Sequence, residues 1–124
     1  MKTRDLITVW DAPDAPKLTP KQISIRLPII VSAKLSALCD LYPRKTKTEI
    51  IGDLLTTALE QIEEEFPRVK GRLENESEEG AVYEDVGKRN RYLKLTEKYL
   101  RELEEEAGIK EPMEFYSTAL IYEE

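Results

Sequence analysis

The stretch KQISIRLP, residues 21–28, alternates strictly between polar and apolar side chains. Because successive side chains of an extended chain point to opposite faces, the two kinds separate. The apolar face holds Ile23, Ile25 and Leu27, and the polar face holds Gln22, Ser24 and Arg26. This alternation predicts a half-buried β-strand. Helical patterns follow it in the chain, so the N–H and C=O groups of the strand need a partner from elsewhere.

Two helices are predicted directly after this strand. Pro28 suits the first turn of a helix, and Pro43 cannot continue one, so the first helix should end at about Tyr42. Its apolar residues recur at helical spacing and are Val31, Leu35, Leu38, Cys39 and Tyr42. The second helix begins with a capping box, TKTE at residues 46–49. Its apolar face comprises Ile50, Ile51, Leu54, Leu55, Ala58, Leu59 and Ile62.

One strand and two short helices offer too little apolar surface for an independent core, and segments this short usually need oligomerisation. If two copies pair their strands antiparallel about a two-fold axis, the ladder closes and the apolar faces meet the helices. The predicted dimer core is Ile23, Ile25, Leu27, Val31, Leu35, Leu38, Ile50, Ile51, Leu54, Leu55, Ala58 and Leu59. The opposite face then displays the polar residues twice, on a two-stranded ribbon that fits the DNA major groove.

The order QISIRLP, a helix and then TKTEIIGDLLTTAL resembles the ribbon-helix-helix family of Arc- and MetJ-type DNA-binding proteins. The resemblance rests on the alternating strand that ends in Leu27-Pro28 and on the T-x-T-E-I-I opening of the second helix, and it covers residues 21 to about 62. Members of this family are obligate dimers that read DNA with such a ribbon. The resemblance therefore implies a homodimer bound to double-stranded DNA.

The resemblance also implies which residues touch DNA. Arginine pairs with guanine, glutamine with adenine, and serine with several bases. The implied base contacts are Gln22, Ser24 and Arg26. The start of the second helix offers free N–H groups and a positive dipole end to a phosphate. The implied phosphate contacts are Arg44, Lys45, Thr46, Lys47 and Thr48.

Two features depart from the family pattern. Members usually turn between the helices with a glycine, whereas this chain has Tyr42-Pro43-Arg44-Lys45, which can be one residue longer. Ile29 and Ile30 occupy positions that are usually polar and exposed in the family. We therefore expect the N-terminal arm or the C-terminal region to cover these two isoleucines.

The rest of the chain is divided by its composition. Residues 1–20 are predicted as an arm with a short strand at Leu6–Trp10, and residues 21–65 as the ribbon-helix-helix domain. Residues 66–83 are predicted as a linker, and residues 84–124 as a helix that stops at Gly108 and an apolar tail. The tail could be a strand, a short helix or a docking segment. The predicted fold class is mainly α, a ribbon-helix-helix dimer with a C-terminal helical extension.

Composition limits the classes of function. The 124 residues contain no histidine and one cysteine, and the usual phosphate-binding glycine loops are missing. We therefore predict no catalysis, no metal and no cofactor. No apolar run is long enough for a membrane span, and the lone Cys39 fits a reducing compartment, so we predict a cytoplasmic protein.

Charge separates the two halves of the chain. Residues 17–62 carry a net charge of +3, with seven basic and four acidic side chains, whereas residues 63–124 carry −8, with ten basic and eighteen acidic side chains. The first prediction of function is a transcriptional repressor or a plasmid or mobile-element accessory factor. The first alternative is an antitoxin whose residues 63–124 bind a toxin. The second is a ribbon-helix-helix dimer that binds proteins without DNA. A higher oligomer remains open.

Overall fold

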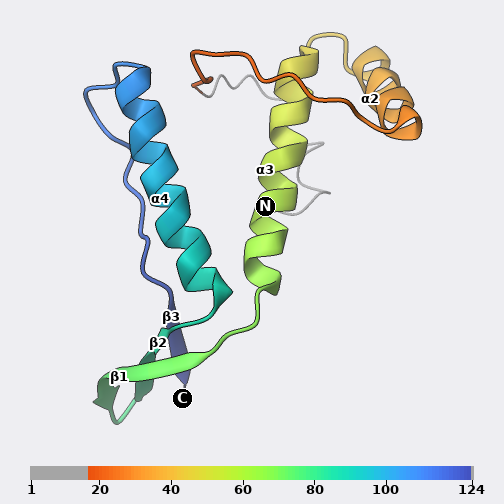
Figure 1. The fold of residues 1–124 in the computed structure, drawn as a ribbon. Helices are drawn as coiled ribbons and strands as arrows, with labels where there is room; N and C mark the ends of the chain where they lie inside the picture. Colours follow the sequence, from red (N-terminus) through yellow and green to blue (C-terminus); the bar gives the residue numbers. More distant parts are fainter. Residues whose placement is uncertain (1–16, 124) are drawn as a thin grey trace. The chain divides into compact units, whose positions relative to one another are not determined.

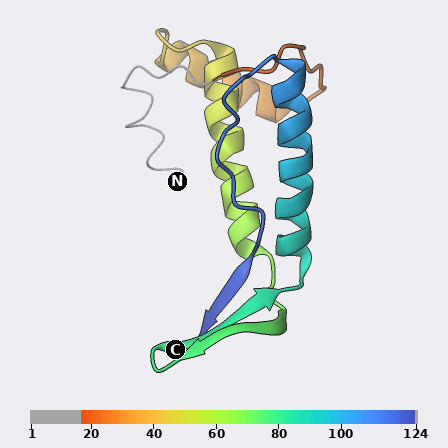
Figure 2. The ribbon, with the colours of Figure 1, turned by 90° about the vertical axis from the view of Figure 1, so that its left-hand side faces the viewer.

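The computed structural model describes residues 17–123. The chain divides into two compact units, Met1–Glu64 and Glu65–Glu124, which we call unit 1 and unit 2. Figure 1 labels the helices and strands, and Figure 2 gives a second view of them. The short strand predicted at Leu6–Trp10 and most of the predicted N-terminal arm lie outside the described residues.

Unit 1 contains the two helices that the sequence predicted. Helix α2 spans Ile29–Leu41 and begins directly after Pro28. Helix α3 spans Lys47–Glu65, after the short turn that contains Pro43. The capping box is confirmed, because the N–H of Glu49 donates to Thr46 Oγ1 at 3.1 Å and the N–H of Thr46 donates to Glu49 Oε1 at 3.0 Å. Both helices therefore start where local chemistry places them.

Unit 2 contains an antiparallel sheet with strand order β1-β2-β3, in which β1 spans Lys70–Ser77, β2 spans Gly80–Asp85 and β3 spans Leu120–Glu123. β1 and β2 form a hairpin, with two register shifts along β1. β3 arrives from the far end of the chain and pairs with β2 from Ala81↔Glu123 to Glu84↔Leu120. Figure 2 shows the strands of this sheet side by side.

Helix α4, Lys88–Glu106, lies between β2 and β3 in the sequence. It ends at Glu106 and is followed by Gly108, whose φ of 69° is a left-handed conformation that glycine adopts at little cost. The N–H of Gly108 donates to the carbonyl of Glu105, and the N–H of Ile109 donates to that of Glu104. These two bonds form a Schellman motif, so the predicted stop at Gly108 is confirmed.

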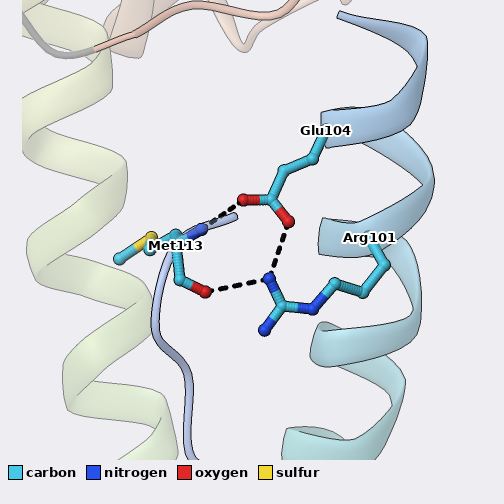
Figure 3. A network of polar contacts seen from close by, with 3 residues as sticks. All are labelled: Arg101, Glu104 and Met113. Atoms are coloured by element: carbon cyan, nitrogen blue, oxygen red, sulfur yellow. Dashed lines mark hydrogen bonds and ion pairs between the residues drawn. The ribbon is translucent and has the colours of Figure 1, made fainter. Parts of the chain in front are cut away.

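Polar contacts hold the segment after α4 against that helix. Arg101 Nη1 donates to Glu104 Oε1 at 2.7 Å and to the carbonyl of Met113 at 2.8 Å (Figure 3). The N–H of Met113 donates to Glu104 Oε2 at 2.6 Å. Further along, the N–H of Ala119 donates to Asn90 Oδ1 at 3.1 Å. These hydrogen bonds hold the segment against α4 as it returns to the position where β3 joins the sheet.

The predicted fold class is wrong in one respect. The described residues form three helices and a three-stranded antiparallel sheet, so the fold is mixed α and β and not mainly α. Residues 66–83, predicted as a linker, contain β1 and part of β2, and the predicted C-terminal helical extension is a helix combined with this sheet. Most of β1 is exposed, so it lacks the apolar alternation by which a strand is identified in a sequence.

Candidate nucleic-acid interface

Residues 22–28 approach α2 as a segment that is neither helical nor paired in a sheet within the single chain. Ile23, Ile25 and Leu27 are 79%, 66% and 39% exposed. Together with residues of α2 and α3 they line a groove of about 540 Å³. The apolar lining from the two helices is Val31, Leu35, Ile51, Leu54 and Leu55. A large exposed apolar surface of this kind marks a site where another molecule binds.

The three predicted base-contact residues are all exposed on this segment. Gln22 and Arg26 do not contribute to the groove lining, whereas Ser24 does, beside its apolar neighbours. Gln22 and Arg26 are therefore separated from the apolar groove, whereas Ser24 is not. Pairing of the segment with a second copy stays a prediction, because the described chain is a single copy.

The start of α3 places two of the predicted phosphate-contact residues in solvent. Lys47 and Thr48 are exposed in the first turn, where backbone N–H groups have no partner within the helix. Arg44 is exposed in the preceding turn. Cationic side chains and free N–H groups at a helix start are the groups that bind a phosphate.

Lys45 and Thr46, the other two predicted phosphate-contact residues, already have partners within the chain. Lys45 Nζ lies 3.8 Å from Glu49 Oε2, and its side chain is 8% exposed. The Thr46 hydroxyl accepts the N–H of Glu49. The hydrogen bonds from Thr46 and the nearby charge of Lys45 hold the pKa of Glu49 below its ordinary value. These three residues fix the start of α3, so Lys47, Thr48 and Arg44 are the groups most accessible to a phosphate.

The predicted dimer core divides into a buried part and an exposed part. Leu35 and Ile50 are buried at the contact between α2 and α3. The residues packed against them are Leu38, Cys39, Tyr42, Ile51 and Leu54. The other predicted core residues are exposed in the chain, namely Ile23, Ile25, Leu27, Val31, Leu55, Ala58 and Leu59. Ile29 and Ile30 are likewise 90% and 62% exposed, and their predicted cover by the N-terminal arm or the C-terminal region stays a prediction.

Sequence reasoning missed the polar residues that organise unit 2. Asp85 is fully buried, and its Oδ1 accepts the N–H groups of Val69 and Gly87 at 3.2 and 2.9 Å. Glu104 begins an acidic run with Glu105 and Glu106 that is typical of a solvated surface, yet it is 7% exposed. One signal was present, because Arg101 precedes Glu104 by three positions, the spacing of an ion pair on a helix.

Three negative findings concern metal ligands, membrane spans and similarity to known proteins. No group of three or more potential metal ligands occurs within residues 17–123. No helix in that range combines the length and apolar character of a membrane span. No protein-family model, curated protein or solved structure matches the chain.

Proposed function

We propose that this protein is a cytoplasmic, sequence-specific DNA-binding homodimer, acting as a transcriptional repressor or as an accessory factor of a plasmid or mobile element. Residues 21–28 of two copies would pair as an antiparallel ribbon and enter the major groove. The observation that carries the proposal is the exposed apolar groove of unit 1, to which Ile23, Ile25 and Leu27 contribute. A second copy of the same segment would supply both the missing β-ladder and the missing apolar cover.

The polar side chains of residues 21–28 and the start of α3 support DNA as the ligand. Gln22 and Arg26 are exposed and can form two-point hydrogen bonds to adenine and guanine. Lys47 and Thr48 at the start of α3 would bind backbone phosphates and fix the position of the ribbon. Residues 17–62 carry a net positive charge, whereas the rest of the chain is negative. The DNA contacts are therefore proposed on the part of the chain that has the favourable charge.

The decisive experiment is selection of bound sequences from a random duplex pool, followed by affinity measurements on the selected site. Arg26→Ala should weaken binding by about 1–3 kcal/mol for each base that Arg26 recognises, and it should relax the sequence preference. Lys47→Ala should weaken binding to all sequences alike and reduce the salt dependence. Lys34→Ala is the matched control, because it removes one exposed cation from α2.

The dimer is tested separately from base recognition. Ile25→Asp should abolish both dimer formation and DNA binding, since it places two charges in the proposed ribbon core. Arg26→Ala should leave the dimer intact. Selection of no duplex sequence by a dimeric protein would contradict DNA binding and favour a dimer that binds proteins. A wild-type chain that stays monomeric at high concentration would contradict the ribbon itself.

A further inference from the structure

Helix α4 exposes an apolar stripe. Leu95, Tyr99 and Leu103 follow one another at intervals of four residues and are 42%, 54% and 43% exposed. Residues this far apart lie on one side of a helix. Leu93 and Glu104 are buried on a different side, and Glu104 faces the chain segment that returns along α4 (Figure 3). The stripe is therefore an apolar surface of unit 2 that is separate from its core.

The charges of α4 run against the helix dipole. Lys88, Arg89 and Arg91 lie at its beginning, and Glu104, Glu105 and Glu106 lie at its end. The first turn contains no acidic residue and the last turn contains no basic residue. Cations are unfavourable at the positive end of a helix and anions at the negative end, so this arrangement costs stability in an isolated helix.

An antiparallel pair of α4 helices turns this cost into an attraction. The basic beginning of one helix would then lie beside the acidic end of the other. Arg91 and Glu102 both flank the apolar stripe. Arg91 and Glu102 lie at almost equal distances from Glu97 along the helix. The same is true of Lys88 and Glu106, and of Leu95 and Tyr99. Each residue of these pairs would therefore meet its counterpart on the second helix across a two-fold axis near Glu97.

We infer that α4 packs antiparallel against α4 of a second copy of this chain. Leu95 of one copy contacts Tyr99 of the other, and Arg91 of one copy pairs with Glu102 of the other. Such an interface is isologous, so every contact occurs twice. A helix that binds a different protein needs complementarity to that protein, whereas the charges at the two ends of α4 and the pair Leu95 and Tyr99 are complementary to their own reversed order. This inference uses unit 2 alone and does not rest on DNA binding.

Disulfide cross-linking of the full chain tests the contact and its register. In a Cys39→Ser background, a variant with Arg91→Cys is mixed with a variant with Glu102→Cys and oxidised mildly. The mixture should form a covalent dimer, whereas Arg91→Cys alone should form little, because the two copies of position 91 lie at opposite ends of the pair. Lys94→Cys mixed with Glu102→Cys is the control, since Lys94 is exposed on a side of α4 away from the stripe. Equal cross-linking in all three samples would overturn the inference.

Charge exchange tests whether the partner is a second copy. Arg91→Glu and Glu102→Arg each create like-charge pairs in a homodimer, and each should weaken self-association of α4 on the order of tenfold. A mixture of the two variants restores opposite charges and should associate as a mixed dimer, measured by mass spectrometry of the intact complexes. The measurements are repeated with Ile25→Asp, which removes the proposed ribbon dimer. Failure of the mixture to associate would overturn the inference and leave DNA binding by Arg26 untouched.

Discussion

Among the described residues of unit 1, Leu35 and Ile50 form the buried hydrophobic core, while Ile23, Ile25 and Leu27 stay exposed. Unit 2 buries Leu93, Ala119 and Ile121 together with two carboxylates, Asp85 and Glu104. The strands of unit 2 pair within the chain, and its buried carboxylates accept backbone N–H groups.

The difference indicates what each unit needs for stability. Unit 2 pairs its β-strands within the chain, and one oxygen of Asp85 and both oxygens of Glu104 accept hydrogen bonds, including ones from other segments, so non-local hydrogen bonds help to hold it together. Unit 1 leaves apolar side chains in water and has little core to offset the entropy of folding. A second copy would contribute more to the stability of unit 1 than to that of unit 2. The following experiments challenge this comparison, from the largest expected effect to the smallest.

Ile50→Ala should give the largest loss of stability. Ile50 is fully buried at the contact of α2 with α3, and truncation of a buried isoleucine costs about 3 kcal/mol. Amide hydrogen exchange should show faster opening throughout unit 1 and unchanged protection of the sheet in unit 2. Ile25→Ala is the comparison, because it should change little in dilute protein and raise the concentration needed for dimer formation. Equal loss of protection in both units would contradict their independence.

Glu104→Ala should destabilise unit 2 by about 2 kcal/mol, because it removes an ionised acceptor of hydrogen bonds from Arg101 and Met113. The segment after α4 should exchange its amide hydrogens faster, and β3 should lose protection with it. Glu105→Ala changes an exposed neighbour in the same acidic run and serves as the control. If the two variants had the same stability in a denaturant titration, the network would not hold the segment.

Glycine-to-alanine changes should have opposite signs in the two units. A Cβ at Gly71 would collide with the side chain of Val86 and lie 3.2 Å from the carbonyl oxygen of Glu84, so Gly71→Ala should destabilise the hairpin by about 1 kcal/mol. A Cβ at Gly52, within α3, meets no atom within 4 Å, so Gly52→Ala should stabilise unit 1 by about 1 kcal/mol. Thermal unfolding of both variants measures the shifts. Destabilisation by Gly52→Ala would indicate a close contact with a second copy at that position.

The smallest expected effect is a pH dependence of unit 1. The hydrogen bonds from Thr46 and the charge of Lys45 lower the pKa of Glu49 from its ordinary value of 4.5. Because the folded state holds the proton more weakly, Glu49 stabilises the start of α3 at neutral pH, and this contribution disappears as the pH falls through the lowered pKa. Amide exchange at the beginning of α3 should therefore increase in acid. Glu49→Gln should remove this pH dependence and leave that of unit 2 unchanged.

The accuracy of the sequence predictions follows the range of the interactions involved. The starts of α2 and α3 and the end of α4 depend on Pro28, the capping box and Gly108, all of which act within a few residues. The predicted start of the last helix at residue 84 is wrong, because residues 84 and 85 belong to β2 and α4 begins at Lys88. β1 and β2 were missed although they pair locally as a hairpin, because the exposed residues of β1 lack an alternating apolar pattern. A strand was one alternative for the tail, and its pairing joins residues 120–123 to residues 80–85 far away in the chain. The buried roles of Asp85 and Glu104 depend on backbone groups of other segments, so both residues resemble ordinary surface carboxylates in the sequence.

The sequence by itself determined the three helices, the capping box and the division of charge between the two halves of the chain, because each of these depends on side chains and their neighbours along the chain. It also placed the alternating residues 21–28, with one apolar and one polar face, before α2. Only the tertiary structure decided that residues 66–83 contain β1 and part of β2 and that Asp85 and Glu104 are buried. The physical reason is that a strand needs a paired neighbour and a buried carboxylate needs donors from other segments, and neither partner is marked by the residue itself in the sequence.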